Sequence, residues 1–371
     1  MEQLDVNAYY ALGIPAYFLL IAWEVWATRR QGLKVYGFAD TICNISGGMG
    51  EIMIGFFIGP YLFWLYAWAY DHFALIRWPD HSWVPWALAL FGGDFCYYLY
   101  HRAGHAVACL WAIHGVHHQA EEMNVTVAMR HPWFSDLYSV FFYAPLPLLG
   151  IPPLHFFVCI AIISFYALLV HSRVFHRPGF YLLVTPATHI VHHATNPRYL
   201  GKNLGAMFTI WDRLFGTHVE LDPDDPPVLG TRRGYETHSG ARSQWIFFRD
   251  LLAAARQADN WRDRFWVFFG HPGWLPPGAS LPATHPPPAD REIGWLTKSY
   301  VMLQYVPMAL FSLMIVAQRE LFSAGLVAVV AVFYFWGLAT LGGMLDGSRP
   351  ARRWEAARLV TGALVVCFWI A

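Results

Sequence analysis

Residues 101–118 read HRAGHAVACLWAIHGVHH, and their order is H-x-x-x-H followed by H-x-x-H-H. A second H-x-x-H-H appears much later in the chain, within TPATHIVHH at residues 185–193. Side chains three or four residues apart lie on one face of a helix, so each group can direct its imidazoles toward one point. The histidines of the three groups are His101, His105, His114, His117, His118, His189, His192 and His193.

Eight imidazoles are too many for one four-coordinate ion. Imidazole is a suitable ligand for iron, zinc, copper and nickel. A single histidine on a surface helix is more often a solvated side chain than a ligand. Two ordered copies of one motif, with a further pair upstream and apolar segments on both sides, favour metal binding. The spacing therefore predicts a two-metal site, most consistent with iron.

The composition indicates an integral membrane protein. Hydrophobic residues make up 56% of the 371 residues, and only 13% are charged, against about 25% in soluble domains. The 18 Trp and 19 Tyr are of the kind that gathers at bilayer interfaces. A net charge of zero and the lack of a basic stripe argue against a nucleic-acid partner. The five cysteines contain no C-x-x-C, so neither a disulfide framework nor a thiolate metal site is expected.

The order of apolar and polar segments predicts the topology. Arg29, Arg30 and Lys34 follow the first apolar segment and are expected in the cytoplasm. Residues 35–48 are expected as a separate short piece at the membrane surface. Prolines in 145–153 divide residues 134–170 into a re-entrant hairpin. The apolar segments expected to span are 8–27, 52–70, 82–100, 300–316, 321–341 and 356–371.

This topology places all three histidine groups on the cytoplasmic side. The predicted fold is an all-α integral membrane protein, a multi-span helical bundle with a re-entrant helical hairpin and a cytoplasmic, histidine-rich di-metal helical cap. Residues 243–268 are expected as one amphipathic helix that lies on the membrane or covers the metals. The expected parts are 1–87 and 298–371 as membrane segments, 88–218 as the catalytic region and 219–297 as a cytoplasmic loop and helix region.

Two further residues are candidates near the metals. Asp94 lies on the same helical stripe as His101 and His105, so it either orients a ligand imidazole or is an ion-paired helix residue. An ionisable group deep in a spanning segment favours function. His171 stands at the exit of the hairpin and is either a ninth ligand or a partner of one.

The motifs HRAGH, LWAIHGVHHQAEEMN, TPATHIVHH and KNLGAMFTIWDRLFGTH make the region 88–218 resemble the membrane fatty acid hydroxylase and sterol desaturase superfamily. Within it, EEMN and WDRLFGT are most similar to alkylglycerol monooxygenase-like members. The resemblance implies a non-haem di-iron centre held by the eight clustered histidines. It also implies functional roles for Glu121 and for Asn124, both within EEMN.

The function implied by this resemblance is O2-dependent hydroxylation or desaturation of a membrane lipid. Electrons come from an external donor, either a pterin or a reductase chain, and zinc can replace iron in a purified sample. Ser172 and Arg173 stand where the alkylglycerol monooxygenase-like members tend to show an acidic residue shortly after the His171 position, which leaves sterol-modifying and ornithine-lipid hydroxylating activities as alternatives. The expected location is a bacterial inner membrane with a cytoplasmic catalytic face. A histidine-rich metal transporter or metal-binding protein is the rival of another class.

Overall fold

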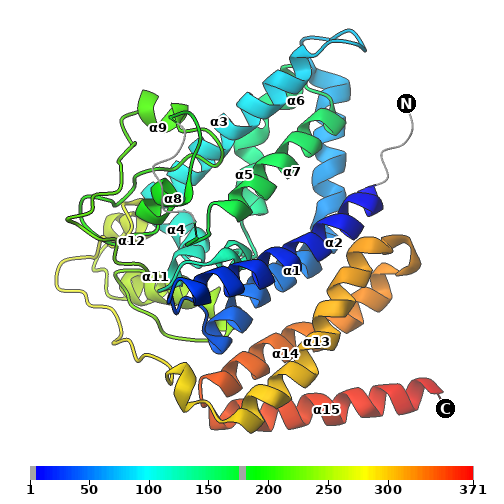
Figure 1. Cartoon of the computed structure of the whole chain (residues 1–371), viewed down its shortest axis with the longest axis vertical. Coiled ribbons are helices and arrows are strands. Elements are labelled where there is room, and N and C mark those ends of the chain that lie inside the picture. Colours follow the sequence, from blue (N-terminus) through cyan, green and yellow to red (C-terminus); the bar gives the residue numbers. More distant parts are fainter. Residues whose placement is uncertain (1–5, 175–180, 371) are drawn as a thin grey trace.

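The computed structural model describes residues 6–174 and 181–370, and this part of the chain is helical, with isolated bridges and no strand (Figure 1). Three helices are long and apolar enough to cross a membrane, namely α2, α13 and α14. The expected spans at 8–27, 82–100 and 356–371 also form helices, but none of them is among these three within the residues described. The long helices are α1 (Val6–Arg30), α2 (Phe38–Phe73), α3 (Val84–Ala106), α13 (Trp295–Ala317), α14 (Ala324–Leu345) and α15 (Arg349–Ile370).

The expectation of a separate surface piece at 35–48 is wrong, because α2 runs unbroken from Phe38 to Phe73. Its first half is buried against the segment that precedes the hairpin. A Cβ at Gly47 would lie 2.8 Å from the backbone N of His131 and from the carbonyl oxygen of Met129. Glycine therefore permits a close approach of two backbones, and this approach draws the N-terminal half of α2 into the protein.

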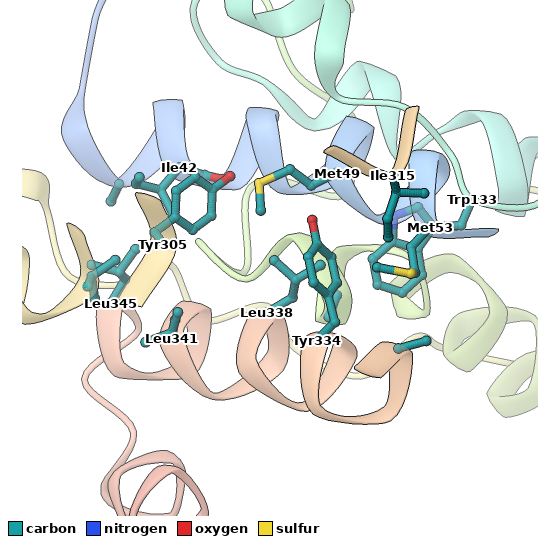
Figure 2. Close-up of a cluster of buried hydrophobic side chains, with 14 of the residues drawn as sticks. Ile42, Met49, Met53, Trp133, Tyr305, Ile315, Tyr334, Leu338, Leu341 and Leu345 are labelled. Atoms are coloured by element: carbon teal, nitrogen blue, oxygen red, sulfur yellow. The ribbon is translucent and has the colours of Figure 1, made fainter. Parts of the chain in front are cut away.

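A hydrophobic core joins the C-terminal helices to α2. Figure 2 shows Ile42, Met49 and Met53 of α2 facing Tyr334, Leu338 and Leu341 of α14, with Tyr305 and Ile315 of α13 between them. The last helix, α15, is attached by polar contacts, because buried Glu355 accepts hydrogen bonds from Tyr300, Thr340 and Arg358. A charged residue is retained in this apolar setting because all its partners are in place.

The region between residues 134 and 170 is broken by prolines as expected. It contains α5 (Asp136–Tyr143), α6 (Pro145–Leu148) and α7 (Pro153–Leu169), and α7 packs along α3. Both α6 and α7 begin at a proline, where the missing N–H has no partner to lose. The turn is held to α2, because Tyr66 donates to the carbonyl oxygen of Ile151. Its re-entrant course in a membrane stays a prediction.

The remaining helices form a cap at one end of α3 (Figure 1). The expected single helix at 243–268 is wrong, because two helices occur there. Asn260 is the N-cap of the second helix, because its side chain accepts a hydrogen bond from the backbone N–H of Asp263. The cap elements are α4 (Ala108–His114), η1 (His117–Gln119), η2 (Val125–Met129), α8 (Pro186–His192), α9 (Ile210–Leu214), α10 (Gly240–Ser243), α11 (Ile246–Arg256) and α12 (Trp261–Phe269), with the one-turn helices η3 (Asp290–Glu292) and η4 (Arg319–Leu321) beyond them.

Candidate metal centre

Nine histidines from four parts of the chain form two adjoining groups. The end of α3, the α4–η1 turn and α8 each supply members, and His171 enters from the end of the hairpin. Within each group the nitrogen atoms able to bind a metal all lie within 4.8 Å of one another. The five-histidine group is His101, His105, His114, His118 and His192, and the four-histidine group is His117, His171, His189 and His193.

The Nε2 atoms are spaced as the ligands of a metal ion would be. In the five-histidine group, the Nε2 of His114 lies 3.0 Å from that of His101 and 3.1 Å from that of His118. In the four-histidine group, the Nε2 of His189 lies 3.0 Å from that of His171 and 3.1 Å from that of His193. Metal–nitrogen bonds of about 2.1 Å place neighbouring nitrogens about 3.0 Å apart at a right angle and about 3.4 Å apart in a tetrahedron. The observed spacing is close enough for the nitrogens of each group to share an ion.

Backbone carbonyl groups orient three of the rings. The Nδ1 atom of His101 lies 2.8 Å from the oxygen of Leu204, and the Nδ1 atom of His192 lies 2.9 Å from the oxygen of Lys202. His171 is held in the same way, at 2.6 Å, by Ala167 one turn earlier. A carbonyl oxygen can only accept, so each Nδ1 carries the proton and each Nε2 keeps a lone pair for a metal.

Unpaired buried atoms support the fit to metal ions. The Nε2 atoms of His105 and His192 are buried, and neither has a hydrogen-bond partner within residues 6–174 and 181–370. Such atoms are costly to bury unless another group satisfies them. Desolvation also lowers the pKa of His192 to about 4 and holds the pKa of His118 and His193 well below the usual range. These imidazoles are therefore neutral at pH 7, which is the form that binds metals.

The local sequence explains how α8 presents its three rings. Thr185 and Thr188 form a capping box, and Pro186 occupies the first turn, so the helix begins at a defined residue. The loop after α8 is held by Asp212, which accepts from the backbone N–H groups of Leu204 and Gly205. That contact positions the Leu204 carbonyl group that orients His101.

Asp94 does not orient a histidine, which corrects one of the two readings of this residue. Its carboxylate is fully buried and accepts from the backbone of Met207, the backbone of Phe208 and the indole N–H of Trp211. Both oxygens are thus used by residues 207–211. The carboxylate faces the loop that follows α8, and no ion pair of Asp94 occurs among the described residues, so the alternative of an ion-paired residue is also not met.

Glu121 and Asn124 also lie apart from the clustered imidazoles. Glu121 is exposed on the turn after η1, and desolvation, with Asp40 next in importance, raises the pKa of its carboxyl group. Asn124 is buried, but its amide oxygen accepts from Thr126 to start η2 and its amide nitrogen donates to the carbonyl oxygen of Val35. The structure therefore gives Asn124 a positioning role and gives Glu121 no contact with the metal centre in the described chain.

Two buried charged residues that support the site were not identified from the sequence. Arg130 donates to the carbonyl oxygen of Val116, to Asn44 and to Gln119, and so holds both sides of the turn that carries His117 and His118. Glu24 accepts from the hydroxyl of Tyr36 and from the backbone of Val125 and Arg173. Glu24 could have been identified from the sequence, because it is a lone carboxylate in an apolar segment.

Two cavities reach the histidines from different sides. The cap cavity, of about 790 Å³, lies beneath α11 and is lined by His105, His118, His192 and Phe247. Phe247 packs on Trp111 there, so α11 covers the centre, as one of the two expectations for this region stated. The hairpin cavity, of about 200 Å³, lies between α3, α5 and α7 and is lined by His114, His117, His171 and His189.

Comparisons of the sequence with known proteins identify a matching family model and several relatives. Residues 86–217 match the family model described as fatty acid hydroxylase. The chain is 29% identical to alkylglycerol monooxygenase from Xenopus tropicalis, over 95% of this chain and 81% of the relative. It is 29% identical to the enzyme of that name from Danio rerio, over 96% and 82%, and 28% identical to that from Homo sapiens, over 86% and 73%. No solved structure matches the chain.

Proposed function

We propose, from the match of residues 86–217 to the fatty acid hydroxylase family model, that the protein is a membrane-bound di-iron oxygenase that hydroxylates a membrane lipid. The substrate class suggested by the relatives is an alkylglycerol, because that word is part of their name. The observation that carries the proposal is the pair of histidine groups, five and four, each compact enough to hold an ion.

The reaction is an insertion of oxygen into a C–H bond. One atom of O2 becomes the hydroxyl group on the lipid and the other leaves as water, with two electrons and two protons supplied by an external donor. Iron, when bound, supplies the redox chemistry that side chains lack, because an unactivated C–H bond does not respond to acids or bases. The donor is a pterin or a reductase chain.

The chain's own residues prepare the site for this chemistry. Burial keeps the imidazoles neutral, and the carbonyl groups of Leu204, Lys202 and Ala167 fix the rings before any ion binds. The apolar wall of the hairpin cavity, which includes Ile160, Ile163 and Leu168, excludes water and suits an alkyl chain. The cap cavity, whose lining includes Trp111, Arg233 and Trp274, is the proposed place of the electron donor.

The positions of the histidines favour an enzyme over a metal transporter. A transporter would carry ionisable residues at mid-depth along several spans. Here the rings gather at the end of α3, in α4, η1 and α8, and after α7, and none belongs to α2, α13 or α14, the helices best suited to cross a membrane. The proposed setting is an integral membrane protein of a bacterial inner membrane with the cap on the cytoplasmic side.

The test combines metal content with lipid products. Membranes holding the wild-type chain are supplied with hexadecylglycerol, a sterol or an ornithine lipid under ¹⁸O2, and products are identified by mass spectrometry. We expect one ¹⁸O atom in the product from hexadecylglycerol and about two iron atoms per chain. His117→Ala and His192→Ala should lower both the iron content and the product, whereas His285→Ala, an exposed histidine outside both groups, should change neither. Full iron content in both cluster variants would refute the proposal.

A further inference from the structure

Three titratable side chains lie together in the wall of the hairpin cavity, apart from the clustered histidines. Glu51 of α2, His131 and Asp136 at the start of α5 all line this cavity, and the Nδ1 atom of His131 lies 3.1 Å from Oε1 of Glu51. The same cavity touches both histidine groups through His114 and His117. A ligand held by these three side chains would therefore lie in the space that reaches the metal centre.

We propose that Glu51, His131 and Asp136 select the polar end of the lipid, and that the head they accept is uncharged and carries hydroxyl groups. This inference rests on the proposed function and names the residues that choose its substrate. We refer to these three residues as the head-group site.

The charges of the cavity wall exclude an anionic head. The head-group site contains two carboxylates, and no lysine or arginine of residues 6–174 and 181–370 lines the cavity. Arg130 is adjacent in sequence to His131, but its guanidinium group is buried and donates to Val116, Asn44 and Gln119. A carboxylate or phosphate head at this site would thus meet two carboxylates, and His131, the third member of the site, is already paired with Glu51.

Both donors and acceptors are available in the wall. The Glu51 side chain is 32% exposed and that of His131 is 44% exposed, so the head-group site is reachable from outside the protein core. No hydrogen bond engages the carboxylate of Asp136 among the described residues, which leaves it free to accept from a ligand. Ser135 and Ser139 add hydroxyl groups to the same wall. A hydroxyl group both donates and accepts, whereas an ammonium group only donates, so this mixture favours a hydroxylated head.

A second observation points independently to a polar ligand. His189 lines the cavity and is 7% exposed, and its Nδ1 atom is buried without a partner. Its Nε2 atom lies among the nitrogens of the four-histidine group. Metal-binding histidines ordinarily donate their second N–H to an oxygen atom. An oxygen atom of the lipid would supply the missing acceptor.

The experiment measures binding separately from turnover. The full chain in lipid nanodiscs is titrated with tritiated hexadecylglycerol, and hexadecanoate and hexadecylammonium compete in turn. We expect the wild-type protein to prefer hexadecylglycerol over hexadecanoate by about tenfold or more. Glu51→Gln and Asp136→Asn should each reduce that preference by about three- to tenfold, the effect of one lost charge-assisted hydrogen bond. Asp71→Asn, an exposed change at the far end of α2, is the matched control and should leave it unchanged.

A variant that gains binding of one lipid separates a change in selectivity from simple misfolding. Asp136→Lys should improve the binding of hexadecanoate, because it places a cation in the wall. Equal losses for all three lipids in Glu51→Gln and Asp136→Asn would show that these residues only hold the turn before α5, and would overturn the inference. A preference of the wild-type protein for hexadecanoate or hexadecylammonium would overturn it as well.

Turnover under O2 then separates this inference from the proposed function. Selective binding of hexadecylglycerol with no oxidation of any lipid would overturn the proposed function and leave the head-group site supported. Oxidation of hexadecylglycerol and hexadecanoate with equal efficiency would overturn the head-group site alone.

Discussion

The Nε2 atoms of His117 and His171 lie 3.1 Å apart, although 54 residues separate the two histidines along the chain. One belongs to the turn after α4, and the other follows the end of the hairpin helix α7. Their contact joins the cap to the apolar hairpin. His171 therefore belongs to the four-histidine group on equal terms with the residues of the H-x-x-H-H motifs.

This contact predicts the metal stoichiometry of a His171 variant. His171→Ala removes one of the four nitrogens in its group but leaves the five-histidine group complete. We expect bound iron to fall from about two atoms per chain to about one, measured by mass spectrometry of the purified protein. His285→Ala, in an exposed loop, should retain the wild-type value. Retention of both ions by His171→Ala would show that this ring only supports the site.

A second prediction concerns the pH dependence of the metal-free protein. Burial lowers the pKa of His192 to about 4 and that of His171 to about 3, whereas histidines of an unfolded chain titrate near 6.5. Between these values the unfolded chain binds more protons than the folded one, so the free energy of unfolding falls as the pH drops below about 6.5. Thermal unfolding from pH 8 to pH 5 would measure this slope. His192→Gln should make the slope shallower, and an unchanged slope would contradict the assignment.

Arg130 gives a prediction about stability. Arg130→Met would leave the carbonyl oxygen of Val116 and the side chains of Asn44 and Gln119 without their donor. Each unsatisfied buried acceptor costs roughly 1–3 kcal/mol, so a loss of about 3 kcal/mol or more is expected in thermal unfolding. Arg130→Lys should recover only part of it, because an ammonium group cannot reproduce the planar fork. Arg262→Ala, an exposed arginine on α12, should have little effect.

Two glycines of α2 form a matched pair for a packing test. Gly47→Ala would place a Cβ 2.8 Å from backbone atoms of Met129 and His131, so a destabilisation of about 1–3 kcal/mol is expected. Gly55 has open space at the same position, and Gly55→Ala should be neutral or stabilise α2 by up to about 1 kcal/mol. Equal effects of the two changes in thermal unfolding would show that the close approach at Gly47 contributes nothing.

Sequence reasoning succeeded where a property depends on spacing. Histidines four residues apart share a face, as His101 and His105 do, and prolines in 145–153 interrupt the hairpin, because both effects act within one or two turns. The same reasoning failed for α2, since Gly47 and Gly48 suggested no burial until the backbone at 129–131 was placed against them. It also gave Asp94 two possible roles, and the structure shows neither among the described residues, because the actual partners lie more than a hundred residues away.

The sequence by itself determined which imidazoles would be available and that those four residues apart would lie on one face. Only the tertiary structure decided how they are shared between two groups, because the division does not follow the motifs. His114 and His118 join one group while His117 joins the other, and His192 is separated from its neighbours His189 and His193. The physical reason is that one turn of helix directs adjacent side chains to different sides, and the distant segments packed on each side supply the remaining nitrogens.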